Sequence, residues 1–143
     1  MMIKAIMHGC NGKMGQVIAG LAAEDAEITL VAGIDAHDEG KNPFPVFTSI
    51  KDCDVPADVV IDFSVAPAVD GLLDYCMEKQ LPCVLCTTGL SEEQLKKVEE
   101  ASKKTAVLRS ANMSLGINML MKLLKQAAST LAPAGFDVEV VEK

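Results

Sequence analysis

The strongest constraint on this chain is a glycine-rich turn between two apolar segments near its N-terminus. Residues 2–7 form an apolar run, residues 8–15 hold three glycines spaced three apart, and residues 16–21 continue with apolar character. Glycines let a strand turn sharply into a helix and let a pyrophosphate approach backbone that lacks a Cβ. The N–H groups at the start of such a helix attract anions. The pattern predicts a strand, a phosphate-binding turn and a helix.

An acidic residue after the second predicted strand supports this interpretation, which a glycine triplet alone would not carry. Residues 27–34 are rich in β-branched side chains, and Asp35 follows them, 20 residues beyond Gly15. In a dinucleotide-binding βαβ unit, an acid at this place accepts hydrogen bonds from the adenosine ribose hydroxyls. The alternative is that Asp35 only caps the end of its strand. Because strand, turn, helix, strand and acid come in the expected order, we favour the ribose contact.

The rest of the chain alternates between predicted strands and helices. Strands are predicted at residues 58–64, 82–86 and 105–110, with a short extended piece at residues 46–48. Helices are predicted between residues 69 and 80, from a capping box at Ser91 to about Lys103, and at residues 115–131. This order indicates an α/β fold with a Rossmann-type doubly wound parallel sheet. The carboxyl ends of its strands are expected to meet at one crevice.

The last segment, residues 136–143, alternates like a strand with one buried face. Because an isolated strand cannot satisfy its own backbone groups, two interpretations remain open. The segment either adds to the first sheet or belongs to a longer chain that this sequence does not complete.

Composition excludes several classes of protein. The net charge of −7 leaves no basic stripe for a phosphate backbone, so nucleic acid is not an expected partner. The N-terminus lacks a basic region with a cleavage site, and no apolar run approaches ~18 residues, so we expect a soluble cytoplasmic protein that binds no membrane. An aliphatic sequence with 3% aromatic residues suits a parallel sheet covered by helices.

Five cysteines are scattered through this acidic chain, so we expect reduced thiols rather than a disulfide framework. Cys83 and Cys86 have a metal-like spacing. They lie in a predicted strand, however, where residues three apart point to opposite faces. We therefore expect no metal site.

Four ordered segments carry a resemblance to a known family: residues 9–15, 60–64, 87–89 and 111–118. In them the chain resembles 4-hydroxy-tetrahydrodipicolinate reductase, also called dihydrodipicolinate reductase, of bacterial lysine (diaminopimelate) biosynthesis. The resemblance covers the whole chain. It implies that the chain is the cofactor-binding part of an enzyme that uses NADH or NADPH to reduce 4-hydroxy-tetrahydrodipicolinate to tetrahydrodipicolinate. It also implies that the full-length form is a homotetramer.

The same resemblance implies a dinucleotide-binding domain at residues 1–114, followed at residues 115–143 by a linking helix and the first strand of an incomplete second α+β domain. The family's catalytic His and Lys pair is expected beyond Lys143, and neither His8 nor His37 matches it. This chain alone is therefore expected to be inactive.

The resemblance also implies roles for particular residues. The backbone at residues 9–14 would hold the pyrophosphate and Asp35 the adenosine ribose, while the nicotinamide would lie near Phe63, residues 86–88 and residues 110–113. The complete set of implied cofactor residues is Gly9, Cys10, Asn11, Gly12, Lys13, Met14, Gly15, Asp35, Phe63, Cys86, Thr87, Thr88, Ser110, Ala111, Asn112 and Met113. Without the resemblance, Phe63 would be assigned to the core, Thr87 and Thr88 to local backbone bonds, and Asn112 to a turn.

The expected cofactor is NADH, with NADPH possible. Asp35 would stand near the 2′-phosphate of NADPH, and two like charges at about 4 Å cost up to ~4 kcal/mol at an effective dielectric of 20. His37 and Lys41 can offset part of that repulsion.

Two other functions stay open. One is a non-catalytic module that binds or senses NAD(P), with residues 138–141 as a docking edge. The other is a different dehydrogenase of the same fold, against which the segment at residues 111–118 argues.

Overall fold

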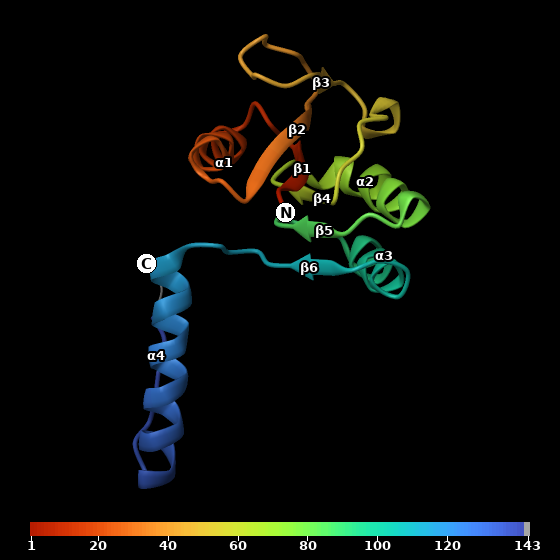
Figure 1. The fold of residues 1–143 in the computed structure, drawn as a ribbon. Coiled ribbons are helices and arrows are strands. Elements are labelled where there is room, and N and C mark those ends of the chain that lie inside the picture. The colour runs from red at the N-terminus through yellow and green to blue at the C-terminus, as the bar shows by residue number, and fades with distance from the viewer. Residues whose placement is uncertain (142–143) are drawn as a thin grey trace. The chain divides into compact units, whose positions relative to one another are not determined.

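The computed structural model describes residues 1–141. The chain divides into two compact units, Met1–Ala111 and Asn112–Lys143, and each is described by itself. The first unit holds a six-stranded sheet in the order β3-β2-β1-β4-β5-β6, in which every neighbouring pair is parallel (Figure 1). The strands are β1 (Ile3–His8), β2 (Ile28–Ile34), β3 (Val46–Phe47), β4 (Val59–Asp62), β5 (Cys83–Leu85) and β6 (Val107–Arg109).

Three helices cover this sheet: α1 (Lys13–Glu24) lies on one face, and α2 (Ala66–Lys79) and α3 (Glu92–Ser102) lie on the other (Figure 1). The predicted doubly wound parallel sheet is therefore confirmed. The chain runs outward from β1 to β3 and then returns to β4 on the other side of β1. The order of the strands reverses between β1 and β4, which is where open α/β sheets bind their ligands.

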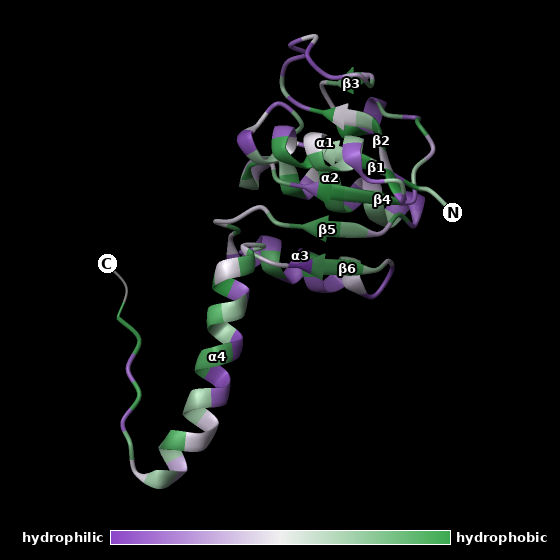
Figure 2. Ribbon diagram, turned by 60° about the vertical axis from the view of Figure 1, so that its left-hand side comes forward, coloured by the Kyte–Doolittle hydropathy of each residue, from purple (hydrophilic) through white to green (hydrophobic). Residues whose placement is uncertain are grey.

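The core follows from the aliphatic strands. Figure 2 shows the strands as the most apolar part of the first unit. Ile6 on β1 and Val60 on β4 are fully buried, and α2 packs Val69, Leu72 and Leu73 into the same cluster. At roughly 25 cal/mol for each Å² of buried apolar surface, such aliphatic side chains contribute about 1.5–3 kcal/mol each. The capping box predicted at Ser91 is present at the start of α3.

The helix after the glycine turn begins earlier than the sequence suggests. We expected it after Gly15, but α1 starts at Lys13 with Gly12 as its N-cap. Gly15 therefore lies in the first turn of the helix, where a Cβ would collide with the carbonyl oxygen of Gly9 and stand 2.7 Å from that of Cys10. Because Gly15 has no side chain, α1 can pack directly against the glycine turn.

The second unit contains α4 (Leu115–Leu131), which has the predicted bounds, and a short 3-10 turn at Ala132–Ala134. The Ser114 hydroxyl caps α4 by accepting from the N–H of Ile117. The strand expected at residues 136–143 is not formed over residues 136–141, which have no regular secondary structure. Alternation alone does not make a strand, because its N–H and C=O groups need a pairing partner. The last two residues of this prediction lie outside the described part.

Candidate functional site

A cavity of about 520 Å³ opens at the carboxyl edge of the sheet, where β1, β2 and β4 end. Five of the residues predicted to bind a cofactor line this cavity, namely Gly9, Asn11, Gly12, Asp35 and Phe63. The other lining residues are His8, Ile34, Ala36, Glu39, Thr48, Ser64, Val65 and Ala68. The cavity is therefore built mainly from the ends of the strands on both sides of the point where the sheet order reverses.

The glycine turn forms one wall of the cavity. Gly9 has a left-handed backbone with φ of +83°, and a Cβ there would stand 2.6 Å from the carbonyl oxygen of Phe63. The turn therefore fits against the end of β4 only because Gly9 has no side chain. Among residues 1–141, the N–H groups of Lys13, Met14 and Gly15 have no acceptor. These donors at the start of α1 can bind an anion.

Asp35 is half-buried at the end of β2. One carboxylate oxygen accepts the N–H of Asn11 at 2.9 Å, and the other accepts the N–H of Ala36 at 2.8 Å. The local bond to Ala36 is the kind that the capping interpretation expects. Each carboxylate oxygen has about two acceptor sites, so Asp35 can still accept hydroxyls from the cavity.

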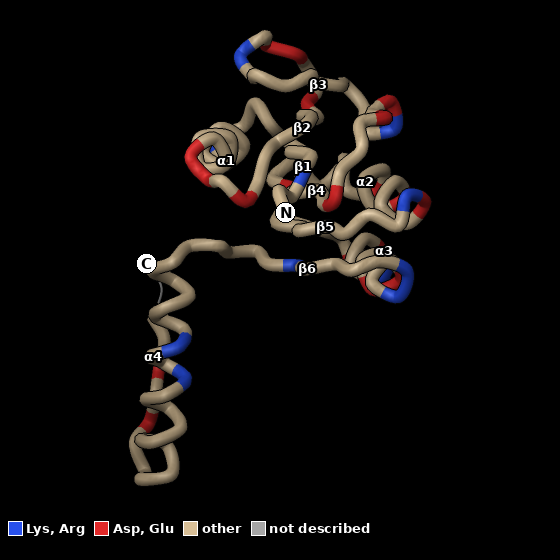
Figure 3. Tube along the Cα trace, in the orientation of Figure 1, with Lys and Arg blue, Asp and Glu red and all other residues tan. Residues whose placement is uncertain are grey.

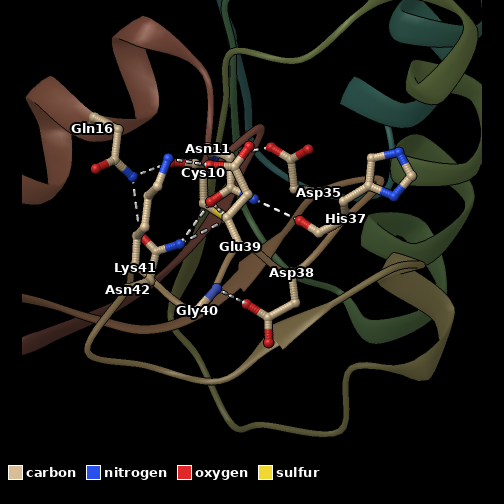
Figure 4. Close-up of polar contacts among 10 residues, drawn as sticks. All are labelled: Cys10, Asn11, Gln16, Asp35, His37, Asp38, Glu39, Gly40, Lys41 and Asn42. Carbon is tan, nitrogen blue, oxygen red and sulfur yellow. Dashed lines mark hydrogen bonds and ion pairs between the residues drawn. The ribbon is translucent and has the colours of Figure 1, made fainter.

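The loop between β2 and β3 is tied to the glycine turn by amide side chains (Figure 4). Asn11 donates to the carbonyl of His37 at 2.6 Å, and its own amide oxygen accepts from Asn42 at 2.8 Å. Gln16 on α1 donates to Asn42 at 3.0 Å and to the carbonyl of Cys10 at 2.8 Å. These bonds fix the loop beside Asp35.

The same loop carries charges of both signs (Figure 3). Lys41 forms an ion pair with Glu39 at 2.5 Å, and Glu39 lines the cavity. Lys41, which was expected to offset the charge of a 2′-phosphate, is therefore already paired with an acid.

A network of polar side chains centred on Asp62 joins the ends of β1, β4 and β5. Asp62 at the end of β4 is fully buried. Its Oδ1 lies 2.6 Å from His8 Nδ1 and accepts the Ser64 hydroxyl at 2.6 Å and the Ser64 N–H at 3.3 Å. Its Oδ2 accepts the Thr87 hydroxyl at 2.6 Å.

These bonds keep the Asp62 carboxyl ionised. Burial by itself would raise the pKa of Asp62, but hydrogen bonds from His8, Ser64 and Thr87 outweigh burial, so this pKa lies below its ordinary value. An ionised carboxylate only accepts, so Nδ1 of His8 must be the donor.

Other predicted residues lie outside the lining of the cavity. Cys10 is buried, and burial together with the nearby Asp35 raises its pKa to about 11. Cys86 and Thr87 are also buried, whereas Thr88 is exposed. The Thr87 proton is donated to Asp62, 25 residues away, rather than to local backbone as the alternative supposed.

The last four predicted residues straddle the division between the units. Ser110 and Ala111 end the first unit, and the N–H of Ser110 donates to the carbonyl of Leu85. Asn112 and Met113 belong to the second unit, where the Asn112 side chain accepts the N–H of Ser114. The cofactor contacts expected of Asn112 and Met113 stay predictions.

Sequence reasoning did not assign a role to His8, Glu39, Asp62 or Ser64. A usable signal was present for two of them. His8 and Asp62 each close an apolar strand with a polar residue, and parallel neighbours bring such ends together. Within residues 1–141 no group of three or more His, Cys, Asp or Glu side chains is placed to hold a metal ion. None of the described helices combines the length and apolar character that crossing a bilayer requires.

The sequence of this chain is similar to those of known proteins. Residues 3–113 match the family model for the N-terminus of dihydrodipicolinate reductase. The 4-hydroxy-tetrahydrodipicolinate reductase of Caldanaerobacter subterraneus subsp. tengcongensis is 53% identical over 143 residues, and that of Clostridium novyi is 46% identical over 142 residues. The alignments cover 100% and 99% of this chain and 56% of each relative. The chain thus spans about half the length of these relatives.

Solved structures show the same fold. Dipicolinate-bound dihydrodipicolinate reductase from Paenisporosarcina sp. TG-14 matches with a TM-score of 0.78 and 26% identity, over 90% of this chain and 54% of that one. The WlbA dehydrogenase from Bordetella pertussis, solved with NADH and UDP-GlcNAcA, matches with a TM-score of 0.70 at 16% identity, over 91% of this chain and 42% of that one. The second likeness shows the fold alone. From the family model and these relatives, the chain belongs to the dihydrodipicolinate reductase family and corresponds to its N-terminal part.

Proposed function

We propose that the first unit binds NADH or NADPH in the cavity at the carboxyl edge of its sheet. The observation that carries this proposal is the shared lining of the cavity by the glycine turn and Asp35. Free N–H groups at the start of α1 suit the pyrophosphate, and Gly9 and Gly12 let it approach the backbone. Asp35 retains acceptor sites for the adenosine ribose. The dinucleotide supplies the hydride, and the protein binds and orients it.

We assign the nicotinamide end of the dinucleotide to the side of the cavity formed by Phe63 and Ser64, close to Thr87 and Thr88. Ser64 and Thr87 lie 3.4 Å apart through their hydroxyls and are both bound to Asp62. Asn112 and Met113 are retained as candidate contacts on the strength of the family resemblance.

NADH is the preferred cofactor in this proposal. Asp35 and Glu39 both line the cavity, and Lys41 is paired with Glu39. A 2′-phosphate would meet both carboxylates, and the Lys41 charge is already paired. Like charges a few Å apart near a surface repel by about 1 to 4 kcal/mol before salt screening, so NADPH binds more weakly.

The activity that we propose for the parent protein is reduction of 4-hydroxy-tetrahydrodipicolinate to tetrahydrodipicolinate in lysine biosynthesis. Its relatives carry this reductase name, and the chain covers 56% of their length. We propose that the groups that bind substrate and donate a proton belong to the remaining part of the parent protein. The 143-residue chain is then a cofactor-binding part that does not turn over substrate.

A calorimetric titration of the chain with NADH and with NADPH tests the binding proposal. Saturable binding of both, tighter for NADH, is the expected result. Adding 4-hydroxy-tetrahydrodipicolinate and following NADH absorbance tests the rest, and no oxidation above background is expected. Absence of binding contradicts the first proposal, and turnover by this chain contradicts the assignment of the catalytic groups to the remaining part.

A further inference from the structure

His8 is a buried imidazole with one nitrogen engaged and the other free. Its side chain is 7% exposed, and Nδ1 is held by Asp62 at 2.6 Å. For Nε2, no hydrogen-bond partner exists among residues 1–141. The described structure contains no fully buried polar side-chain atom without a partner, so Nε2 must reach accessible space. The accessible space beside His8 is the cavity, which His8 lines.

The place of His8 in the fold decides what it can touch. It is the last residue of β1 and directly precedes Gly9, so it adjoins the turn expected to hold the pyrophosphate. Asp62 fixes the orientation of the ring because its carboxylate accepts the proton of His8 Nδ1. A ring held in this way loses little conformational entropy when a ligand arrives.

We propose that His8 is a binding residue for the dinucleotide and that Nε2 hydrogen-bonds to its ribose-diphosphate portion, with Asp62 as the positioning residue that orients the ring. This inference rests on the proposed cofactor site and adds a contact to it. With a single ring proton held at Nδ1, Nε2 accepts from a ribose hydroxyl. The contact is with the part of the cofactor shared by ADP-ribose and NADH, because the glycine turn and His8 border the same cavity.

Two substitutions separate binding from folding. His8→Asn retains an amide N–H near the position of Nδ1, so Asp62 keeps its donor, but the variant has no atom at the position of Nε2. His8→Gln reaches toward the Nε2 position with a polar group and serves as the matched control. We expect His8→Asn to weaken the binding of ADP-ribose and of NADH by about tenfold, equivalent to about 1.4 kcal/mol. His8→Gln should lose less affinity for both ligands. His8→Asn should keep the wild-type thermal midpoint within a few degrees, whereas His8→Gln gives up the donor to Asp62 and should lower the midpoint.

A second measurement uses the wild-type chain and does not depend on a variant. The sequence contains two histidines, so a nitrogen-15 NMR spectrum of the imidazoles contains two ring systems, and His37→Asn assigns them. Saturation with ADP-ribose should move the Nε2 resonance of His8 and leave Nδ1 hydrogen-bonded to Asp62. NADH should produce a similar shift at Nε2.

The outcomes distinguish this inference from the proposed function. If the wild-type chain binds NADH but either the Nε2 resonance stays still or His8→Asn binds as well as wild type, the inference about His8 is wrong and the cofactor site stands. A loss confined to NADH, with ADP-ribose unaffected, also overturns it, since the contact would then be to the nicotinamide. A wild-type chain that binds neither ligand overturns both proposals.

Discussion

Asp62 illustrates how hydrogen bonds stabilise a buried, ionised carboxylate. A buried charge is costly unless donors surround it, and Asp62 accepts from His8, Thr87 and both donors of Ser64. The three partner residues come from the ends of three parallel strands or from the turns that follow them. The carboxylate thereby aligns the segments that line or adjoin the cavity.

Replacing Asp62 with Asn should lower the free energy of unfolding by about 2–3 kcal/mol at pH 7, because the charge-assisted hydrogen bonds are lost. The pKa of Asp62 is lowered on folding, so its contribution is present above the unfolded pKa of about 3.9 and is lost as pH falls toward the folded pKa. The difference between wild type and variant should narrow below about pH 4. Urea denaturation at several pH values measures it.

Asp54→Asn is the control for this experiment, because Asp54 is exposed. It should change the free energy of unfolding by less than about 0.5 kcal/mol at pH 7. If wild type and Asp62→Asn have the same free energy of unfolding at pH 7, the hydrogen bonds to Asp62 do not stabilise the fold.

Glu39 is the residue whose substitution should shift the choice of cofactor. Glu39→Gln removes one carboxylate from the cavity and releases Lys41 from its ion pair. Both changes favour a 2′-phosphate, so NADPH should bind about fivefold tighter, equivalent to about 1 kcal/mol, while NADH changes little. Calorimetry with both cofactors measures the ratio.

Glu27→Gln, at the opposite end of β2, removes the same charge far from the cavity and should leave the ratio unchanged. If both variants change the ratio equally, the effect comes from net charge rather than from Glu39.

At the scale of single residues, the sequence identified the cavity residues that belong to a local motif. The glycine turn and Asp35 were placed in this way, whereas Phe63 was placed only by the family resemblance, and all three line the cavity. His8, Asp62 and Glu39 were not predicted to act, because their roles depend on contacts between segments far apart in the chain. The side chains of His8 and Asp62 meet across 54 residues.

At the scale of elements, helices with strong local signals were predicted well. The capping box sets the start of α3, and Ser114 sets that of α4. The start of α1 was missed because Gly12 caps it with its backbone and leaves no side-chain signal. The strand predicted at residues 136–143 is not formed over residues 136–141, because strand formation depends on a partner and not on alternation alone.

Two glycines in α1 should respond in opposite ways to replacement by Ala. In Gly15→Ala the new Cβ would clash with the Gly9 carbonyl oxygen, and the turn cannot move without disturbing the cavity. We expect a loss of more than about 2 kcal/mol in unfolding free energy. Gly20 has open space around the position of its Cβ, so Gly20→Ala should gain about 0.5–1 kcal/mol from helix propensity.

Chemical denaturation of the two variants provides the comparison, and each serves as the control for the other. Equal effects at the two positions would show that helix propensity, and not the close packing of Gly15, decides the outcome.

At the scale of the whole molecule, the thiols should be inert in the folded state. All five cysteines are buried. Burial and the nearby Asp62 raise the pKa of Cys86 to about 11, and burial with Asp35 does the same for Cys10. Because the thiolate is the reactive form, the native chain at pH 8 should react with a disulfide reagent far more slowly than the unfolded chain.

The measurement is a count of thiols that react within minutes, first in buffer and then in guanidinium. We expect fewer than one reactive thiol per chain in buffer and five per chain in guanidinium. Rapid reaction of one thiol in buffer would show that its segment opens locally, and labelling would identify which.

The central position of β1 has a consequence for how the protein is made. β1 pairs with β2 on one side and with β4 on the other, and its last residue lies opposite Asp62 in the sheet. That partner is synthesised 54 residues after His8. At about 5–20 residues per second, a ribosome takes roughly three to ten seconds to supply it. During that interval one edge of an apolar strand stays unpaired, and the nascent chain is open to capture by chaperones or by misfolding.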